Sequence, residues 1–245
     1  MSSPNYSRKM LDLEYEGRRP IRAALQLLKQ THAISNQDVA ELGSGLGFNL
    51  EIFAGDSRVV GIEGLSSAAE SATGRGIPTI VADLARTVPL ESERYDLVLC
   101  VDVLEHLLDP SHCVAEAHRI LKPNGLLVVN VPNHFTLSGR LRITFGSGID
   151  SVRFFPQHAD WNYPHLRFFR YASIVDLLCR GDFRIEEDWS GQFASIPLVN
   201  RFDALRGCQA AKFVASRWPN LFAGGFFLLA RRGVAGEVQH VSPGT

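Results

Sequence analysis

Features that mark secreted, membrane-spanning and nucleic-acid-binding proteins are scarce in this chain of 245 residues. Its four cysteines are widely spaced and form no CxxC pair, which predicts reduced thiols in a cytoplasmic protein rather than a disulfide framework. Its apolar runs fall well short of the roughly 18 residues of a membrane span, and its polar N-terminus predicts no secretory signal. The net charge of −1 gives no basic field to attract a nucleic acid.

A glycine-rich segment follows the first strongly apolar run. Residues 39–47 read VAELGSGLG and place Gly43, Gly45 and Gly47 at alternate positions. Glycines at the end of a strand permit a tight turn with positive φ and let a ligand approach the backbone. Phe48–Ala54 is predicted to begin a helix, whose unpaired amide groups would point at that ligand. The segment therefore predicts a nucleotide-type binding loop.

Strand and helix patterns alternate on both sides of this loop. The predicted strands are Asp38–Leu42, Val59–Glu63, Thr79–Ala82, Tyr95–Val101, Leu126–Val131, Phe183–Trp189 and Gly224–Arg231. Helices are predicted from the capping pairs Ser67 with Glu70, Asp109 with Pro110, and Ser173 with Asp176. A turn is expected at Lys122–Gly125, and Pro197–Trp218 is expected to be mostly helical with Phe213 on its apolar side. This alternation predicts an α/β protein with a doubly wound sheet.

The domain organisation follows from the segments outside this alternation. Residues 1–36 are predicted to form an N-terminal helical extension, 37–232 the main domain and 233–245 a flexible tail. Within the extension, Arg18–Gln30 has apolar residues at helical spacing and either packs on the core or covers a ligand; packing is favoured. The irregular segment at about 134–169 is rich in arginine and aromatic residues, which predicts a lid inserted beside a binding site.

Two acidic residues stand at the ends of predicted strands. Glu63 is placed to accept hydrogen bonds from both hydroxyls of a ribose, and Asp83 could accept one from an adenine amine. Either residue could instead be a solvated acid at the end of a strand. A site for NAD would want the same acid at Glu63, but Phe48 occupies the place of the third glycine of the GxGxxG fingerprint. A phenylalanine there would hinder the close helix–strand packing of that fingerprint.

An acid and an imidazole lie together in Asp102–His106, DVLEH, which directly follows the fourth strand. Side chains at the carboxyl ends of parallel strands face the ligand crevice. The pair could provide a general base, half of a metal site, or a structural cluster that positions the ligand. His134 and His165 in the expected lid are further candidates for a base.

In order, the segments ELGSGLG, GIEG, VADL, VDVLEHLLDP and RILKPNGLLVVNVPN resemble the class I S-adenosylmethionine-dependent methyltransferases. Among these, they look most like the small-molecule branch that includes the ubiquinone-biosynthesis O-methyltransferases. The resemblance covers roughly residues 37–190. It implies a Rossmann-like sheet of seven strands, mostly parallel with an antiparallel last strand, a methyltransferase domain at 37–232, and S-adenosylmethionine as cofactor.

The resemblance also implies roles for particular residues. Glu41 and the glycines would hold the methionine part of the cofactor, Glu63 the ribose, Asp83 with Leu84 the adenine, and Val101 with Asp102 the sulfonium end. The implied cofactor-binding set is Glu41, Gly43, Ser44, Gly45, Gly47, Glu63, Gly64, Asp83, Leu84, Val101 and Asp102. The candidate catalytic residues are His106, His134 and His165, and no metal ligand is assigned.

The implied function is methyl transfer by in-line displacement to a small-molecule acceptor, with no nucleic-acid partner and no membrane span expected. Three alternatives stay open. One is a metal-assisted RNA 2′-O-methyltransferase, because Asp102, Glu105 and His106 with a lid histidine resemble the metal cluster of small-RNA enzymes. The others are a regulatory protein that binds S-adenosylmethionine without turnover, and an NAD oxidoreductase. The sequence leaves open the acceptor, the atom that is methylated and the oligomeric state.

Overall fold

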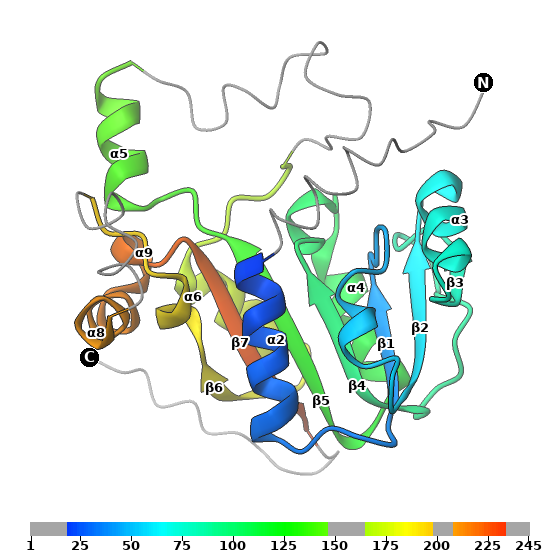
Figure 1. Cartoon of the computed structure of the whole chain (residues 1–245). Coiled ribbons are helices and arrows are strands. Elements are labelled where there is room, and N and C mark those ends of the chain that lie inside the picture. Colours follow the sequence, from blue (N-terminus) through cyan, green and yellow to red (C-terminus); the bar gives the residue numbers. More distant parts are fainter. Residues whose placement is uncertain (1–18, 147–164, 198–207, 234–245) are drawn as a thin grey trace.

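A computed structural model describes residues 19–146, 165–197 and 208–233 (Figure 1). Within them, seven strands form one sheet in the order β3-β2-β1-β4-β5-β7-β6. The strands are β1 (Asp38–Leu42), β2 (Arg58–Glu63), β3 (Thr79–Val81), β4 (Tyr95–Val101), β5 (Leu121–Pro132), β6 (Phe183–Asp188) and β7 (Gly225–Arg232). The first five strands pair in parallel, and β7 runs antiparallel to both β5 and β6. The predicted seven-stranded sheet with an antiparallel last strand is confirmed.

One face of the sheet is covered by α2 (Arg19–Thr31) and the short 3₁₀ turn η1 (Leu50–Ile52), as Figure 1 shows for α2. Leu25 and Leu28 of α2 belong to the same buried cluster as Val39, Leu97 and Leu99 of the central strands. The helix thus packs on the core, which is the interpretation that the sequence favoured over a cover for a ligand.

The opposite face is covered by α4 (Pro110–Ile120) and α6 (Tyr171–Arg180). Their buried residues, among them Val114 and Ile174, share a second cluster with Ala40 and Val98. Because successive side chains of a strand point to opposite faces, neighbouring positions such as Val39 and Ala40 belong to different clusters. Helices on both faces make this the doubly wound arrangement expected from the alternating pattern.

The structure describes six further helical segments. They are α3 (Ser66–Gly74), η2 (Leu104–His106), α5 (Leu137–Thr144), η4 (Ser190–Phe193), α8 (Gln209–Arg217) and α9 (Pro219–Phe222). None of the side chains of α5 is buried among the described residues, and the helix projects from the body of the protein (Figure 1). It lies inside the predicted lid at 134–169, of which 147–164 fall outside the described residues. Among the helices described, none is long and apolar enough to cross a membrane.

The helix predicted to begin at Phe48–Ala54 is wrong. The chain forms only the 3₁₀ turn η1 there, with Phe53 donating its amide to the carbonyl of Leu50 at 2.9 Å. Side chains three residues apart stack on one side of a 3₁₀ turn. The tight turn therefore sends both Leu50 and Phe53 into the core, where each is fully buried.

Two of the three predicted capping pairs are also wrong. Helix α3 begins at Ser66, so Ser67 lies inside it, and the preceding Leu65 offers no side-chain cap. Helix α6 begins at Tyr171, and Ser173 accepts a hydrogen bond from the amide of Arg170 instead of acting as the N-cap. The third pair is confirmed, since Asp109 caps α4 by accepting from the amide of Ser111 at 3.0 Å.

The turn expected at Lys122–Gly125 is part of β5, which starts at Leu121. Asn124 has a positive φ of 62°, as in a turn, but its conformation accompanies a register shift between β4 and β5 rather than a chain reversal. Phe213 of α8 was expected on an apolar face and is instead 67% exposed. Residues 198–207 of the same predicted helix lie outside the described part of the chain.

Candidate functional site

The glycine loop after β1 has the left-handed backbone that its sequence predicts. Gly43, Gly45 and Gly47 have φ values of 77°, 52° and 78°. At Gly43 the backbone also passes close to its neighbour, because a Cβ placed there would lie 2.5 Å from Cγ2 of Val103. Conformation and space both require glycine at this position.

The amide groups of this loop are largely occupied by the protein itself. Gly43 and Ser44 donate to the carbonyl of Ile62 at 2.8 and 3.0 Å, and Gly47 donates to the carbonyl of Ser44 at 2.8 Å. Gly45 donates to Oε2 of Glu63 at 2.8 Å. The unpaired amides were predicted for the start of a helix at Phe48–Ala54, where the chain forms only the 3₁₀ turn η1, and the four loop amides named here are bonded within the protein. With these four amides bonded, the loop offers few of the donors that cradle a phosphate at a helix N-terminus.

Glu63 at the end of β2 is held in place by two backbone amides. Its Oε2 accepts from Gly45, and its Oε1 accepts from Leu65 at 2.9 Å. A carboxylate has about four acceptor positions, so two remain for further donors. The neighbouring Gly64 is exposed and places no side chain over the carboxylate. The geometry suits an acceptor for two ligand hydroxyls, which is the role expected from the sequence.

Beneath the loop lies a buried acid and amide pair. Glu41 is fully buried in β1, and its Oε1 accepts from Nδ2 of Asn49 at 2.7 Å. Ser44, another residue of the implied cofactor-binding set, is also buried. Asn49 was not among the predicted site residues, although it is the one amide side chain in the largely apolar stretch FNLEIF.

The neighbouring Phe48 fills the space beside this loop. It is 6% exposed, packs with Leu46 and Ala68, and carries the guanidinium of Arg75 over its ring at 3.9 Å from the centroid. A buried phenylalanine thus occupies the position where the dinucleotide fingerprint has a glycine.

The two residues expected at the adenine differ in their surroundings. Asp83, just after β3, is exposed and accepts from the amide of Ala85 at 2.9 Å, with Arg86 3.9 Å away. Leu84 is 7% exposed and belongs to the cluster under α4 and α6. Asp83 is therefore available to a ligand at the surface, whereas Leu84 is mainly part of the core.

Val101 and Asp102 end β4 on the other side of the glycine loop. Val101 is buried, and Asp102 has a φ of 52°, a left-handed conformation that costs energy in a residue other than glycine. Asn130 of β5 donates its side-chain amide to Oδ1 of Asp102 at 2.6 Å, and the amide of Asp102 donates to the carbonyl of Asn130 at 3.0 Å. Sequence reasoning missed Asn130, which stands alone within the apolar run LLVVNV.

Cys100, which precedes Val101 in β4, carries a buried thiol. Cys100 and Cys113 are free and fully buried or nearly so. A hydrogen bond with Cys113, together with burial, raises the pKa of Cys100 well above its usual value. A raised pKa and full burial both disfavour the thiolate form that a nucleophilic cysteine needs.

These segments meet at one edge of the sheet. The strand order runs outward from β1 to β2 and β3 on one side, and from β4 to β5 on the other (Figure 1). In open α/β sheets, ligands bind at the carboxyl ends of the strands where the order reverses in this way. The loop after β1 and the acids at Glu63, Asp83 and Asp102 all follow carboxyl ends of these strands.

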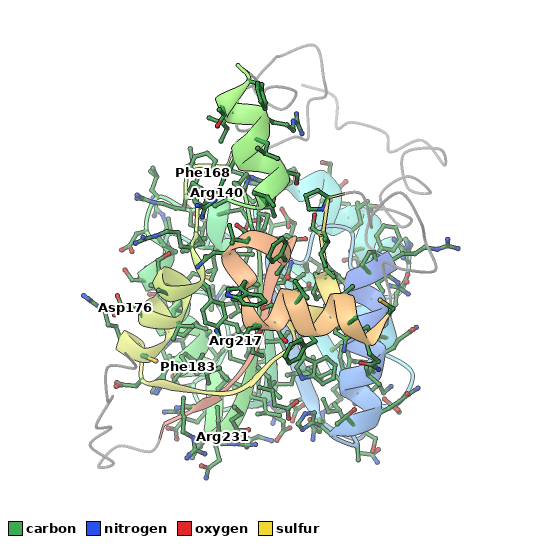
Figure 2. All side chains as sticks on the ribbon, turned by 90° about the vertical axis from the view of Figure 1, so that its left-hand side faces the viewer. Arg140, Phe168, Asp176, Phe183, Arg217 and Arg231 are labelled. Carbon is green, nitrogen blue, oxygen red and sulfur yellow. The ribbon has the colours of Figure 1, made fainter. Side chains whose placement is uncertain are left out.

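The three candidate catalytic histidines lie together. His106 comes from η2, His134 follows β5, and His165 begins the segment that leads to α6. The ring centroids of His106 and His165 are 4.8 Å apart, and Nε2 of His134 lies 2.7 Å from Nδ1 of His165. Phe168 contacts the His134 ring at a centroid distance of 4.9 Å and lies at the end of the protein from which α5 projects (Figure 2).

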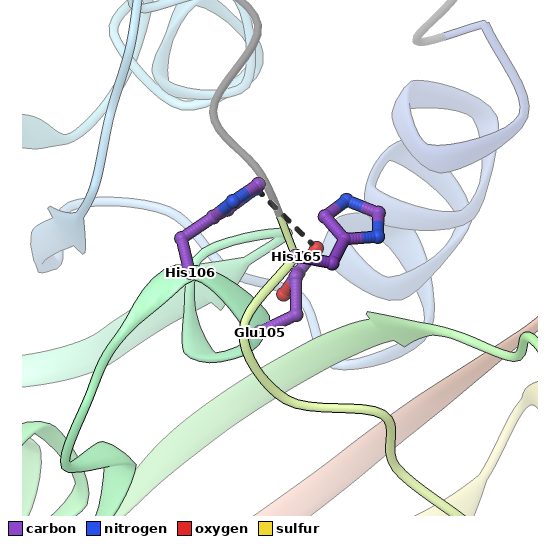
Figure 3. A group of neighbouring side chains, drawn as sticks. All are labelled: Glu105, His106 and His165. Carbon is purple, nitrogen blue, oxygen red and sulfur yellow. Dashed lines mark ion pairs between the residues drawn. The ribbon is translucent and has the colours of Figure 1, made fainter. Parts of the chain in front are cut away.

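Glu105 joins this cluster, although the sequence assigned it only to the metal-assisted alternative. Its side chain is 1% exposed, and its Oε1 lies 3.9 Å from Nε2 of His106 (Figure 3). Its carbonyl accepts from the amides of Leu166 and Arg167 at 2.7 and 3.0 Å, which fixes the segment carrying His165 against η2. The potential metal-ligating atoms of Glu105, His106 and His165 all lie within 4.8 Å of one another.

Comparisons with known proteins agree with this arrangement. Residues 40–129 match a family model described as a methyltransferase domain. A Mycolicibacterium smegmatis protein named as a probable S-adenosylmethionine-dependent methyltransferase is 29% identical over 159 residues, 64% of this chain and 55% of that protein. A ubiquinone biosynthesis O-methyltransferase of Histophilus somni is 28% identical over 43% of this chain and 49% of that protein. The chain spans about half the length of these curated relatives.

Solved structures show the same fold. An S-adenosylmethionine-dependent methyltransferase from Aquifex aeolicus superposes with a TM-score of 0.58 at 13% identity, covering 91% of this chain and 96% of that one. A phosphoethanolamine N-methyltransferase of Haemonchus contortus, solved with phosphomonomethylethanolamine and S-adenosylhomocysteine, gives 0.57 at 19% identity, covering 87% of this chain and 52% of that one. At such identities the likeness concerns the fold.

Proposed function

We propose that this chain transfers a methyl group from S-adenosylmethionine to a small-molecule acceptor, because residues 40–129 match a methyltransferase domain and the Mycolicibacterium smegmatis relative is named as a probable S-adenosylmethionine-dependent methyltransferase. The observation that carries the proposal is the hydrogen bonding of the amide groups in the glycine loop. Its Gly43, Ser44, Gly45 and Gly47 amides are already bonded within the protein, and η1 replaces the long helix that would face a pyrophosphate. A loop of this kind suits a ligand without phosphates.

The charges around the loop support the same ligand. The methionine part of S-adenosylmethionine carries an ammonium group and a sulfonium, and the carboxylates of Glu41 and Asp102 flank the loop on β1 and β4. Glu63, fixed by two amides, would accept from the ribose hydroxyls, and exposed Asp83 would accept from the adenine amine. An NAD site would need donors for two phosphates at the same loop.

The cofactor supplies an electrophilic methyl group on a positively charged sulfur. The contribution of the chain is then alignment and exclusion of water, which can supply most of the acceleration of an in-line displacement. Asp102, held by Asn130 in a strained conformation, would fix the sulfonium end. The histidine cluster next to it would face the acceptor.

A small molecule is the acceptor class that the composition and the relatives favour. The net charge of −1 provides no general attraction for RNA. One of the relatives compared is named as a ubiquinone biosynthesis O-methyltransferase, which acts in the synthesis of a small molecule. The segment at 134–169 would act as the acceptor lid, with α5 and Phe168 at its described ends.

The proposal is tested by calorimetry with S-adenosylhomocysteine on the wild-type chain and on Glu63→Ala. Two hydrogen bonds to a carboxylate contribute at least about 3 kcal/mol, so the variant should bind about 100-fold more weakly or worse. Glu63→Gln keeps one acceptor oxygen and should fall between the two.

Glu70→Ala is the matched control, because Glu70 is an exposed acid on nearby α3 and should bind like the wild type. Absence of heat with well-folded wild-type protein would contradict the proposal. Release of S-adenosylhomocysteine during incubation with a panel of phenols, carboxylates and amines then separates an enzyme from a protein that merely binds the cofactor.

A further inference from the structure

We propose that Glu105, His106 and His165 bind one divalent first-row transition metal ion, and that His134 orients His165 for this role. The four side chains come from three separate parts of the chain: η2, the segment after β5, and the segment before α6. Figure 3 shows Glu105, His106 and His165 turned toward a common point.

The spacing of the donor atoms fits a single ion. One ligand atom from each of Glu105, His106 and His165 lies within 4.8 Å of the other two. Ligand atoms at about 2.0–2.2 Å from an ion are separated by roughly 3–4 Å, so adjustments of less than an ångström bring these donors to it. The distance between Oε1 of Glu105 and Nε2 of His106, 3.9 Å, is already in that range.

The donor set indicates the class of metal. Two imidazoles and one carboxylate bind zinc, and the same set with open positions binds iron, cobalt or manganese, whereas magnesium and calcium prefer oxygen ligands throughout. Three protein ligands leave at least one coordination position open. A water molecule or an oxygen of the acceptor would occupy it.

His134 gives the site its outer hydrogen bond. Metal-ligating histidines commonly use the second ring nitrogen in a hydrogen bond that fixes the tautomer and the direction of the ring. Nδ1 of His165 lies 2.7 Å from Nε2 of His134, so Nε2 of His165 is the atom assigned to the ion. Phe168 packs against His134, with the ring centroids 4.9 Å apart.

Backbone contacts hold the two halves of the site together. The carbonyl of Glu105 accepts from the amides of Leu166 and Arg167, so the two residues that follow His165 are tied to the residue that carries the proposed carboxylate ligand. Glu105 is 1% exposed and His165 is 5% exposed, whereas the His106 side chain is 26% exposed. The ion would thus have two buried ligands and one ligand toward the open side, where a further molecule can reach it.

This assignment changes the role of the histidines. A histidine that binds a metal through its ring nitrogen is unavailable as a general base, so His106 and His165 become ligands and His134 becomes a positioning residue. The inference goes beyond the proposed function and does not depend on it, because metal binding is measurable without cofactor or acceptor.

The test is a titration of the full-length, tag-free chain with Co²⁺, after removal of metal ions by a chelator. Visible absorption reports ligand-field bands of protein-bound cobalt. The wild type should bind one equivalent, and competition by Zn²⁺ should abolish the bands. His106→Ala and His165→Ala should each weaken binding at least about 100-fold, and His134→Ala about 10- to 100-fold, which is the usual cost of losing an outer partner.

His112→Ala is the matched control, since His112 is a half-buried histidine of α4 outside the cluster, and this variant should bind cobalt like the wild type. Circular dichroism of each variant identifies any that fails to fold; His106, the most exposed ligand, provides the safest one. Wild-type protein without cobalt bands, or with bands that His106→Ala leaves unchanged, would overturn the inference. Calorimetry with S-adenosylhomocysteine on the same preparations reports the proposed function separately.

Discussion

At the scale of single residues, Gly43 is the position of the glycine loop where an added side chain would clash most severely, because its backbone passes close to Val103. An alanine at Gly43 would bring its Cβ to 2.5 Å from Val103 in a backbone with φ of 77°. The left-handed conformation costs about 1–2 kcal/mol and the overpacking about 1–3 kcal/mol, so Gly43→Ala should destabilise the protein by about 2–5 kcal/mol. Binding of S-adenosylhomocysteine should weaken in parallel, because the loop must shift.

Gly55→Ala serves as the control for this prediction, because a Cβ there meets nothing within 4 Å and its φ is not left-handed. Its unfolding free energy should stay within about 1 kcal/mol of the wild type. Urea denaturation measures both variants. Equal stability of the two would show that the loop repacks without cost, contrary to the argument from the Val103 contact.

The sequence predicted the site residues better than it predicted the side chains that they contact. Glu63 and Asp102 were predicted from their places at or after the ends of apolar runs, since carboxyl ends of strands meet at one edge, whereas Glu41 was implied by the family resemblance. Their partners were not predicted, because Asn130 reaches Asp102 only through the register that pairs Val101 with Asn130 across β4 and β5. The convergence of His165 with His106 depends likewise on a tertiary contact, the bonds to the carbonyl of Glu105.

At the scale of elements, the strands were predictable, whereas of the helix starts predicted by capping signals only that of α4 was right. Central parallel strands are buried on both faces, so they read as continuous apolar runs, and β1 and β4 have the predicted bounds. Phe48–Ala54 gave a misleading helical signal, because Leu50 and Phe53 are buried through a 3₁₀ turn. Local composition cannot distinguish one turn of 3₁₀ helix from the start of a longer helix.

Helix α2 offers a direct test of its role in packing. Leu28 is fully buried against the central strands, whereas its neighbour Leu27 is 44% exposed. Leu28→Ala should lower the free energy of unfolding by about 2–5 kcal/mol through lost burial and the cavity left behind. Leu27→Ala should change it by no more than about 0.5 kcal/mol.

Thermal and urea denaturation of the two α2 variants give the comparison. A larger effect of Leu27→Ala than of Leu28→Ala would contradict the packing role. If Leu27→Ala instead left stability unchanged but weakened S-adenosylhomocysteine, the helix would cover the ligand as well, which is the interpretation that the sequence placed second.

At the scale of the whole molecule, the two ends of the sheet carry different parts of the proposed reaction. The family match at 40–129 begins within β1 and ends within β5, and it contains every residue proposed for the cofactor. The segment carrying His165, and α5, α8 and β7, lie beyond it. We therefore expect the cofactor to be common to the family and the acceptor to be set by the second half of the chain.

The choice of cofactor affects the stability of the entire fold, and this yields a test that needs no acceptor. A ligand that binds only the folded state adds RT ln(1 + [L]/Kd), which is about 2.7 kcal/mol at 100 times Kd. For a chain of 245 residues, this corresponds to a rise in Tm of about 5–10 °C with S-adenosylhomocysteine. NADH at the same concentration should leave Tm unchanged, because the bonded amides of the glycine loop offer its phosphates few donors. Differential scanning fluorimetry in the presence of a chelator separates this effect from that of any metal ion, and Glu63→Ala should lose the shift. An equal rise with NADH would instead favour a dinucleotide site.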